Sequence, residues 1–343
     1  MKIALWGMKD WEQDYVKKAL GEGESELVFY EGQLKSDNLP PQSDFEIICV
    51  FVDSTVNKAV LDNFQNLKGV VTRSTGYDHV DLKECASRNI VVSSVPSYGE
   101  NTVAEFAFAL ILALSRKVYA AVDNFRETGK YSFEGLMGFD LKGKTIGVIG
   151  TGRIGKYSIK IAKGFGMNVV GYDAFPNEAM SKELDFPYMS FEEVLKISDV
   201  VTIHVPALPE TEHMFNEKTI PLMKKGALLV NTARGSVVKT EALVAALQSG
   251  HLAGAGLDVL EEEGVLKDEV GFVLNGDVTG HNVKIIVGNH VLADMPNVLL
   301  TPHAAFDTKE AIMRILDTTV EDIKGISAGK PVNIVLVDAF AAK

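Results

Sequence analysis

Short runs of apolar residues alternate with segments of helical periodicity along the whole chain of 343 residues. A first series of expected strands covers residues 2–6, 27–30, 47–51, 69–72 and 90–92. A second series begins at Thr145 and continues over residues 168–172, 200–205, 228–231 and 253–257. Apolar strands that alternate with helices are typical of parallel sheets covered by helices on both faces. The pattern therefore predicts an α/β protein with two doubly wound parallel-sheet domains.

Two long helices are expected outside the strand series. The first covers residues 102–121, and Thr102-Val-Ala-Glu105 fits a capping box at its start. The second runs from Lys309 to Ser327. We interpret residues 93–101 and the return near residue 300 as two crossovers between the domains. This predicts a discontinuous domain of residues 1–99 and 300–343, with residues 100–299 inserted as the other domain.

The stretch from Glu261 to Met295 has no clear periodicity. It contains five glycines and the histidines His281 and His290, and we expect a loop-rich flap there. The rest of the chain shows no short-period repeat and no low-complexity tract.

Composition and charge narrow the class of protein. With 46% hydrophobic and 23% charged residues the chain resembles a soluble globular protein, and its net charge of −12 argues against a nucleic-acid partner. Cys49 and Cys85 have no paired spacing, which indicates buried thiols in a reducing compartment. The chain opens on an expected strand rather than a signal peptide, and its most apolar helical run, residues 106–114, is shorter than a membrane span. These features predict a cytoplasmic protein with no membrane partner.

A glycine-rich turn follows the first strand of the second series. Gly150-x-Gly152-x-x-Gly155 lies between this strand and a helical segment, and Asp173 ends the next strand. Gly150 allows a tight turn, Gly152 lets the backbone approach a pyrophosphate, and Gly155 lets the helix pack close to the strand. The pyrophosphate binds at the helix N-terminus, whose N–H groups and dipole favour an anion. This order predicts a Rossmann domain that binds a dinucleotide; the alternative is a glycine-rich turn in an ordinary βα unit.

Asp173 indicates which dinucleotide is preferred. It lies 18 residues beyond Gly155, where a carboxylate accepts hydrogen bonds from the adenosine ribose diol. The same carboxylate repels the 2′-phosphate of NADP, and Ala174-Phe-Pro176 supplies no arginine to bind that phosphate. The sequence therefore predicts NAD as the cofactor.

Three polar side chains follow late strands of the second series. Arg234 follows Leu228–Asn231, Glu263 follows Gly256-Leu-Asp258, and His303 follows the run from Asn297. Ligands of open parallel sheets bind outside the carboxyl ends of the strands, so these residues can face one site. Arginine can hold a substrate carboxylate, histidine can donate a proton to a carbonyl oxygen, and a neighbouring carboxylate favours the imidazolium. The set suits reduction of a 2-oxo acid.

Each of these residues also has an ordinary interpretation. Arg234 can form a surface salt bridge, Glu263 belongs to the acidic run Glu261–Glu263, and a histidine after proline is commonly structural. The histidine pairs His204/His213 and His281/His290 lack the spacing and cysteine partners of a zinc site, so no metal is expected.

Several motifs resemble one enzyme family over nearly the whole chain. They are the glycine-rich turn, His204-Val-Pro, Asn231-Thr-Ala-Arg-Gly, Gly256-Leu-Asp-Val and Thr301-Pro-His. Together they resemble the D-isomer-specific 2-hydroxyacid dehydrogenases. The D-lactate dehydrogenase branch is the most similar, through Arg73–Asp81, Val95–Tyr98, Tyr131–Phe139 and His303–Phe306.

The resemblance implies a role for each matching residue. Arg234 would bind the substrate carboxylate, Glu263 would pair with His303, and His303 would be the acid/base. Thr75 and Gly76 would hold the carboxylate through their N–H groups, and Tyr98 would line the substrate pocket. Arg153 and Ile154 would donate N–H groups to the pyrophosphate, and Asp258 would hold the carboxamide. The remaining cofactor-binding residues, several of which follow the ends of strands, would be Gly150, Gly152, Gly155, Asp173, Val205, Pro206, Thr211, Thr232, Ala233, Arg234 and His303.

Two departures from the family pattern concern the acidic residue. Gly264 stands where many relatives have proline, so the local turn can differ. The interval from Glu263 to His303 is longer than in most of the family, although D-lactate-type members often carry an insertion there. Glu262 therefore stays a competitor for the role of Glu263.

The resemblance implies an NAD-dependent D-lactate dehydrogenase that interconverts pyruvate and D-lactate. One alternative is a family member for hydroxypyruvate, glyoxylate or a branched 2-oxo acid, and another is an NAD-sensing corepressor-like binding protein. The resemblance also implies a homodimer or homotetramer through the 102–121 region, whereas a fully buried core helix is the alternative interpretation of that segment. The family's substrate domain is flavodoxin-like and corresponds to residues 1–99 and 300–343 here; residues 100–299 correspond to the NAD-binding Rossmann domain.

Overall fold

The computed structural model describes residues 1–21, 23, 25–267 and 281–336. The chain divides into two compact units, Met1–Tyr98 with Thr308–Lys343 (unit 1) and Gly99–Asp307 (unit 2). The contacts thus divide the chain at 98/99 and 307/308, where the sequence prediction has 99/100 and 299/300. Both units are parallel sheets with helices on both faces, which confirms the predicted fold class.

Unit 1 contains a five-stranded parallel sheet of order β2-β1-β3-β4-β5. This is the strand order of flavodoxin-like folds. The strands are β1 (Lys2–Trp6), β2 (Glu26–Tyr30), β3 (Ile47–Val50), β4 (Gly69–Thr72) and β5 (Val91–Ser94). Strands β1, β3 and β4 are almost entirely apolar and buried because both faces of the sheet are covered.

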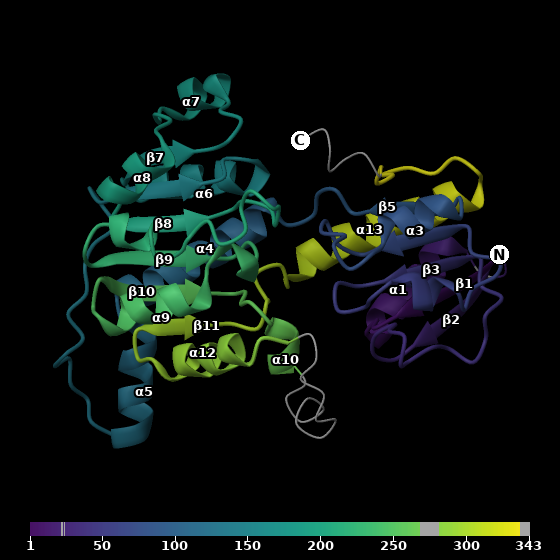
Figure 1. Ribbon diagram of the computed structural model, residues 1–343, viewed down its shortest axis with the longest axis horizontal. Coiled ribbons are helices and arrows are strands. Elements are labelled where there is room, and N and C mark those ends of the chain that lie inside the picture. Colours follow the sequence, from purple (N-terminus) through teal and green to yellow (C-terminus); the bar gives the residue numbers. More distant parts are fainter. Residues whose placement is uncertain (22, 24, 268–280, 337–343) are drawn as a thin grey trace. The chain divides into compact units, whose positions relative to one another are not determined.

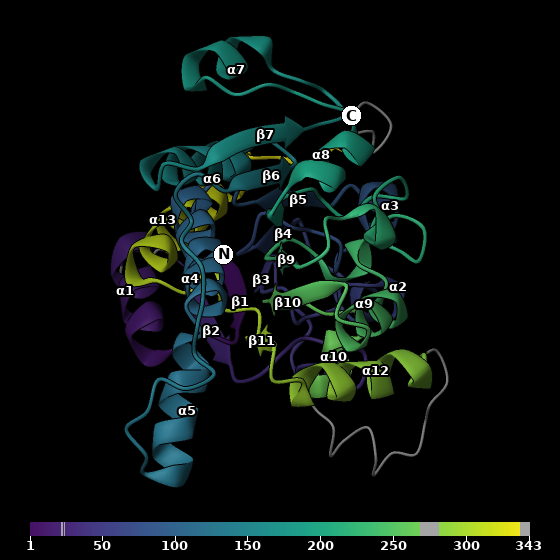
Figure 2. The same ribbon diagram turned by 90° about the vertical axis from the view of Figure 1, so that its left-hand side faces the viewer.

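The helices of unit 1 cover both faces of its sheet. Helices α1 (Asp10–Leu20) and α13 (Lys309–Ser327) pack together on one face, and α2 (Lys58–Leu61) and α3 (Leu82–Ser87) lie on the other (Figure 2). The C-terminal helix α13 therefore completes the N-terminal sheet, and its buried stripe includes Leu316, Val320 and Ile323. After α13 the chain forms an antiparallel bridge between Ile334 and Ser93 of β5.

Unit 2 contains a six-stranded parallel sheet of order β11-β10-β9-β8-β6-β7. The strands are β6 (Thr145–Ile149), β7 (Asn168–Tyr172), β8 (Val200–Ile203), β9 (Ala227–Asn231), β10 (Leu252–Leu257) and β11 (Val298–Leu300). Tyr188 forms a parallel bridge with Gly171 of β7, in the position of the third strand of a classical dinucleotide-binding sheet. With this one-residue strand counted, the order is that of the Rossmann fold, reversed between β6 and β8.

Helices again cover both faces of the sheet of unit 2. Helices α4 (Glu100–Ser115) and α6 (Arg153–Gly164) lie on one face, and α8 (Phe191–Ile197), α9 (Thr240–Gln248) and α12 (Val283–Asp294) lie on the other (Figure 2). Helix α7 (Glu178–Leu184) follows β7, and the short helix α10 (Glu263–Lys267) follows β10. Helix α5 (Val118–Thr128) projects away from the sheet (Figure 1).

The predicted helix 102–121 is two helices, so that prediction was wrong in detail. Helix α4 begins at Glu100 after Gly99, which places Thr102 inside the first turn and excludes the predicted capping box. It ends at Ser115 because Lys117 adopts a left-handed φ of 50°, and α5 starts at Val118. The break separates two environments: α4 is buried against α6 and the sheet, whereas α5 has no buried residue.

The loop-rich flap predicted for residues 261–295 is also partly wrong. Residues 283–294 form helix α12, whose first turn is capped by the Asn282 side chain. The sequence prediction took the glycine at position 288 as a sign of a loop. This glycine lies inside α12, at a point where the helix passes close to the Thr240 side chain. Residues 268–280 lie outside the described part of the chain. In the described part of the chain, no helix combines the length and the apolarity that a membrane crossing requires.

Candidate active site

The ends of the six strands of unit 2 form one row across the sheet. Backbone pairing aligns Tyr172 with Ile149, Ile149 with Ile203, Ile203 with Asn231, Asn231 with Leu257, and Leu257 with Leu300. The residues directly beyond this row are Asp173, Gly150, His204, Thr232, Asp258 and Thr301. Most of the candidate site residues of unit 2 therefore lie in the loops that follow the carboxyl ends of its strands, on the same side of the sheet.

Two glycines of the glycine-rich turn, Gly150 and Gly155, have no room for a side chain. Gly150 has a φ of 87°, and a Cβ on it would lie 2.8 Å from the backbone of His204. A Cβ on Gly155 would lie 2.1 Å from the Gly150 carbonyl oxygen. A Cβ on Gly152, by contrast, would meet nothing within 4 Å, so the turn is open on the side where α6 begins. The first turn of α6 directs its backbone N–H groups, including those of Arg153 and Ile154, to this open side, where they fit a pyrophosphate.

The Asp173 carboxylate is hydrogen-bonded to Thr151 of the same turn. Its Oδ2 accepts hydrogen bonds from the Thr151 N–H at 2.7 Å and from the Thr151 hydroxyl at 3.1 Å, and its Oδ1 accepts one from the Phe175 N–H at 2.9 Å. A carboxylate can accept about four hydrogen bonds, so Asp173 keeps acceptor capacity for a ribose hydroxyl. The carboxylate is thus both fixed in place and chemically able to bind a ribose.

The other predicted cofactor residues lie around the β8 and β9 ends. A Cβ on Gly150 would lie 2.9 Å from Val205, which places Val205 beside the turn. The Thr211 hydroxyl donates to the Pro206 carbonyl at 2.6 Å and accepts from the Leu208 N–H at 2.9 Å. Thr232 is buried, and its hydroxyl has no hydrogen-bond partner within the described residues. An orphaned buried hydroxyl at the same carboxyl end of the sheet as the glycine-rich turn fits a site completed by a cofactor.

His204 is a neutral residue whose side chain packs between α6 and the sheet. Its Nε2 lies 2.9 Å from the Ser158 hydroxyl of α6 and 3.1 Å from the Thr202 hydroxyl of β8. Burial lowers the pKa of His204 to about 3, so the ring carries no charge near neutral pH. It connects α6 to the sheet below the glycine-rich turn and is unsuited to acid/base chemistry.

His303 and Glu263 form a pair at the ends of β11 and β10. The distance from His303 Nδ1 to Glu263 Oε1 is 2.7 Å, and both side chains are partly exposed. His303 adopts a left-handed φ of 53°, which is uncommon for a residue with a side chain. Because Nδ1 faces the carboxylate, Nε2 is the ring nitrogen left to exchange a proton with a substrate.

Asp258 holds the loop that carries His303. Its Oδ1 accepts from the Thr301 hydroxyl at 2.5 Å and from the Ala304 N–H at 2.9 Å, and its Oδ2 accepts from the Ala305 N–H at 2.8 Å. Burial raises the pKa of Asp258, and these hydrogen bonds and the nearby His303 oppose the shift. The carboxylate thus has a structural task that the sequence did not indicate, and its contact with a carboxamide stays a prediction.

Arg234 leaves the end of β9 through a turn that Asn231 stabilises. The Asn231 side chain accepts from the Ala233 N–H at 3.0 Å and donates to the Arg234 carbonyl at 2.9 Å. The guanidinium donates to the Ala233 carbonyl at 2.8 Å. The arrangement sets the direction in which Arg234 leaves the sheet, and Asn231 is a positioning residue that the sequence reasoning did not single out.

The acidic run Glu261–Glu263 is not a solvated surface. The carboxylate of each glutamate is within hydrogen-bond distance of a different histidine ring. The oxygen-to-nitrogen distances are 2.6 Å for Glu261 and His213, 2.9 Å for Glu262 and His281, and 2.7 Å for Glu263 and His303. In this structure the partner of His303 is therefore Glu263 and not its competitor Glu262.

The candidate substrate residues of unit 1 lie in the loops after β4 and β5. The Thr75 hydroxyl donates to the Val95 carbonyl at 2.8 Å, which connects the two loops. The Ser74 hydroxyl donates to the Gly76 carbonyl and approaches the Thr72 hydroxyl, each at 2.6 Å. Tyr98 accepts a hydrogen bond from Arg314 of α13 through its carbonyl oxygen at 2.5 Å. The loop containing Thr75 and Gly76 is thus held by hydroxyl groups of its own residues and of Thr72 at the end of β4.

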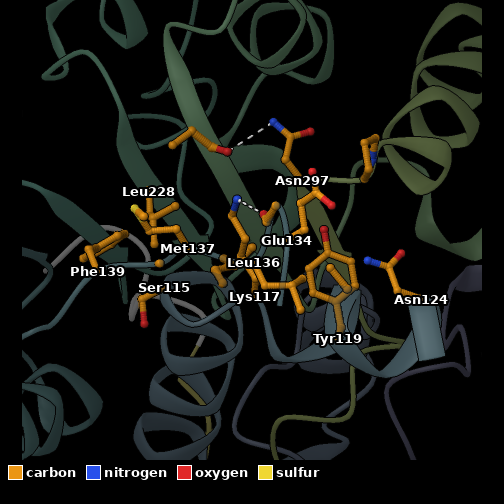
Figure 3. Close-up of a pocket in the computed structure, with 16 residues that line it drawn as sticks. Ser115, Lys117, Tyr119, Asn124, Glu134, Leu136, Met137, Phe139, Leu228 and Asn297 are labelled. Atoms are coloured by element: carbon orange, nitrogen blue, oxygen red, sulfur yellow. Dashed lines mark hydrogen bonds between the residues drawn. The ribbon is translucent and has the colours of Figure 1, made fainter. Parts of the chain in front are cut away.

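A cavity of about 440 Å³ in unit 2 belongs to a different region. Its lining includes Leu228 and Ala253, near the starts of β9 and β10, and Tyr119 and Asn124 of α5 (Figure 3). The candidate active site lies at the opposite, carboxyl end of these strands. The cavity therefore cannot be the site of the chemistry. No group of three or more potential metal ligands occurs in the ranges that the structure describes.

The following features define the class of the protein as a nicotinamide-dependent dehydrogenase. They are a Rossmann sheet with a glycine-rich turn, an acidic residue directly after its second strand in the chain, and a histidine–glutamate pair. Residues 108–305 match the family model "D-isomer specific 2-hydroxyacid dehydrogenase, NAD binding domain". The chain belongs to the family of D-isomer-specific, NAD-dependent 2-hydroxyacid dehydrogenases, and this confirms the resemblance, the enzyme class and the cofactor inferred from the sequence.

Similar proteins cover almost the whole chain. A 2-hydroxyacid dehydrogenase homolog of Zymomonas mobilis is 36% identical over 98% of this chain and 100% of its own. The D-lactate dehydrogenase of Aquifex aeolicus, solved in complex with NAD and lactic acid, is 35% identical with a TM-score of 0.83, covering 96% of each chain. A glyoxylate reductase of Thermococcus litoralis is 34% identical over 92% of this chain and 93% of its own. Relatives with different substrates are thus about equally similar.

Proposed function

We propose that this enzyme is a D-lactate dehydrogenase that interconverts pyruvate and D-lactate with NAD(H) as the cofactor. The observation that carries the proposal is the hydrogen-bonded pair of His303 and Glu263. The two residues follow β11 and β10, whose ends are aligned with the end of β9, the strand that Arg234 follows. The similarity to the Aquifex aeolicus D-lactate dehydrogenase supports the choice of substrate.

The proposed reaction divides the work between three side chains. Bound NADH supplies the hydride that adds to C2 of the 2-oxo acid. Arg234 binds the substrate carboxylate through its planar fork and polarises the carbonyl group. His303 donates the proton on Nε2 to the carbonyl oxygen, while Glu263 at Nδ1 fixes the ring and stabilises its positive charge. In the reverse direction the neutral ring takes the hydroxyl proton.

The remaining assignments complete the proposal. Thr75, Gly76 and Tyr98 are proposed to contact the 2-oxo acid. Asp173 is proposed to bind the ribose and to exclude NADP, and the orphaned hydroxyl of Thr232 is proposed to face the nicotinamide end. The cytoplasmic location expected from the sequence stays a prediction.

A substrate panel tests the proposal directly. Purified protein is mixed with NADH and, in turn, pyruvate, hydroxypyruvate, glyoxylate and a branched 2-oxo acid, and NADH absorbance is followed. We expect the highest kcat/KM with pyruvate, and chiral chromatography of the product should show D-lactate. A higher kcat/KM with glyoxylate would support the second candidate, which the similarity to the Thermococcus litoralis glyoxylate reductase favours. No turnover with any acid would contradict both.

We also propose that the protein is a homo-oligomer and that α5 forms the contact. An isolated helix of 11 residues is marginally stable in water, and α5 has no buried residue. Val118, Val122 and Phe125 form an exposed stripe on α5, and Tyr131 and Phe133 beyond it are 99% and 91% exposed. Such a surface is typical of a protein interface. Many residues of α4 are buried within one chain, so we propose the contact for α5, which begins inside the predicted 102–121 region.

Light scattering tests this contact. The wild-type protein should have at least twice the mass of one chain, and Phe125→Glu should reduce it to one. Asp123→Lys on the polar side of α5 is the matched control and should keep the wild-type mass. A wild-type protein of single-chain mass would exclude the oligomer.

A further inference from the structure

Glu261 is a buried carboxylate in the part of unit 2 that carries the catalytic candidates, and it has no role in the reaction proposed above. Its side chain is 7% exposed. Its Oε2 accepts from both the N–H and the hydroxyl of Thr240 at 2.7 Å, and its Oε1 lies 2.6 Å from His213 Nε2. The Glu261 carbonyl accepts from the Asn289 side chain at 2.7 Å. One residue therefore connects the end of β10 with α9, α12 and the segment of His213.

These contacts bear on the loop that follows Arg234. Thr240 is the first residue of α9, so the carboxylate of Glu261 binds the positive end of that helix. At the other end of the loop, a Cβ on Gly235 would lie 2.0 Å from the Leu260 carbonyl carbon and 2.4 Å from the Glu261 nitrogen. The chain between Gly235 and Thr240 is thus in contact with residues 260–261 at both ends.

His213 holds the middle of the same loop. Its N–H donates to the Ser236 carbonyl at 2.8 Å, and the Phe215 N–H donates to the Val237 carbonyl at 3.0 Å. The Asn216 side chain donates to the His213 carbonyl at 2.7 Å. The imidazole that meets Glu261 therefore belongs to a segment that is itself paired with residues 236–239.

We propose that Glu261, together with His213, is a positioning residue that sets the alignment of Arg234 relative to Glu263 and His303. This inference rests on the proposed function, because it takes Arg234, Glu263 and His303 as the reacting set. Glu261 lies two residues before Glu263, and its side chain fixes the loop that begins at Arg234. A shift of either loop changes the geometry of hydride and proton transfer, and a misplacement of about 1 Å can cost about 100-fold in rate.

The first experiment compares Glu261→Gln with Glu241→Gln. Glu241 is the matched control because it lies next to Thr240 on α9 and pairs with Lys284 at 3.5 Å, away from Arg234. For Glu261→Gln we expect kcat with pyruvate to fall by about 10- to 100-fold, with the Kd for NADH unchanged. Glu241→Gln should keep kcat within about twofold.

A deuterium isotope effect separates positioning from loss of folded protein. NADH deuterated at the transferred position should give a larger isotope effect on kcat in Glu261→Gln than in the wild type, because hydride transfer becomes slower. A variant that is merely less folded has a lower active fraction and an unchanged isotope effect. An unchanged isotope effect, or a wild-type kcat, would overturn the proposal.

Variants of His213 carry the same test if Glu261→Gln does not fold. His213→Ala removes the ring nitrogen and should lower kcat by about tenfold. His213→Gln places an amide donor close to the position of Nε2 and should restore kcat to within about threefold of the wild type. Equal kcat values for the two variants would contradict a role of the Glu261 contact.

Parallel assays of Arg234→Gln and His303→Ala distinguish the two possible failures. If these variants lose turnover while the Glu261 and His213 variants keep it, only the positioning role fails. If the wild-type protein turns over no 2-oxo acid, the proposed function fails and the positioning role fails with it.

Discussion

The two halves of the strand-end row in unit 2 are built by different means. At the ends of β6 and β7 the nucleotide turn is shaped by backbone: positive φ at Gly150, close approach at Gly155, and N–H groups at the start of α6. At the ends of β9, β10 and β11 the geometry depends on side chains that hydrogen-bond to the backbone of nearby loops and helix ends, such as Asn231, Asp258 and Glu261. Changes in the first half should therefore affect cofactor binding, and changes in the second half should affect the chemical step.

The largest expected effect is that of His303→Ala. Loss of the proton donor should lower kcat with pyruvate by about 10³-fold, since general acid catalysis contributes about 10²- to 10⁴-fold. The Kd for NADH, measured by fluorescence titration, should stay within about threefold of the wild type. Near-normal turnover would remove His303 from the mechanism, and a large loss of NADH affinity would break the division between the halves.

Gly155→Val should produce the opposite pattern. The new side chain would collide with the Gly150 carbonyl, so the turn or α6 must move. We expect the Kd for NADH to rise by about 100-fold and stability to fall by about 1–3 kcal/mol. Gly164→Ala in the same helix meets nothing within 4 Å and is the control; it should keep NADH affinity. Unchanged NADH binding in Gly155→Val would contradict the tight packing.

Glu263→Gln tests the pairing with His303. Without the negative charge the imidazolium is less stable, and kcat for pyruvate reduction should fall by about 10- to 100-fold. Glu262→Gln disturbs the contact with His281 instead and should cause a smaller loss. A larger loss in Glu262→Gln would reverse the assignment of the two glutamates.

Replacement of Asp173 by Ser with Arg at position 174 addresses selectivity within the nucleotide half. The exchange removes the charge that repels a 2′-phosphate and adds a cation that binds it. We expect the ratio of kcat/KM for NADH to that for NADPH to fall by about 10- to 100-fold, with kcat at saturating cofactor changed little. An unchanged ratio would show that Asp173 does not discriminate between the cofactors.

The smallest expected effect comes from unit 1 and concerns stability alone. Asp322 of α13 is buried with Oδ1 bonded to Asn333 at 2.8 Å, and burial raises its pKa from 3.8 to about 7. The folded state therefore holds a proton that the unfolded chain releases above pH 4, so this group lowers stability as pH rises from about 4 to 7. Asp322→Asn should raise stability at pH 8 by about 2 kcal/mol and leave it unchanged near pH 4. Tm values at both pH values, with unchanged kcat, would check this.

The sequence predicted most of the fold because buried parallel strands are continuous apolar runs. It also predicted the nucleotide turn, since glycines at this spacing have a local steric reason. It failed at Lys117, where one left-handed residue divides the expected helix in two, and at residues 283–294, where glycine was taken as a loop signal. Pairwise contacts between distant residues, such as Glu261 with Thr240 or Asp258 with Ala305, leave no local signature and could not be predicted.

The aligned strand ends of unit 2 have a consequence for how such enzymes diverge. Side chains alternate between the two faces of a strand, so a one-residue slip of β10 would send Asp258 to the opposite face and expose the core at the same time. Selection for a stable sheet therefore preserves the catalytic frame without any separate constraint. Specificity for new substrates can then evolve through loop insertions and changes of pocket side chains, while the register of the paired strands stays the same.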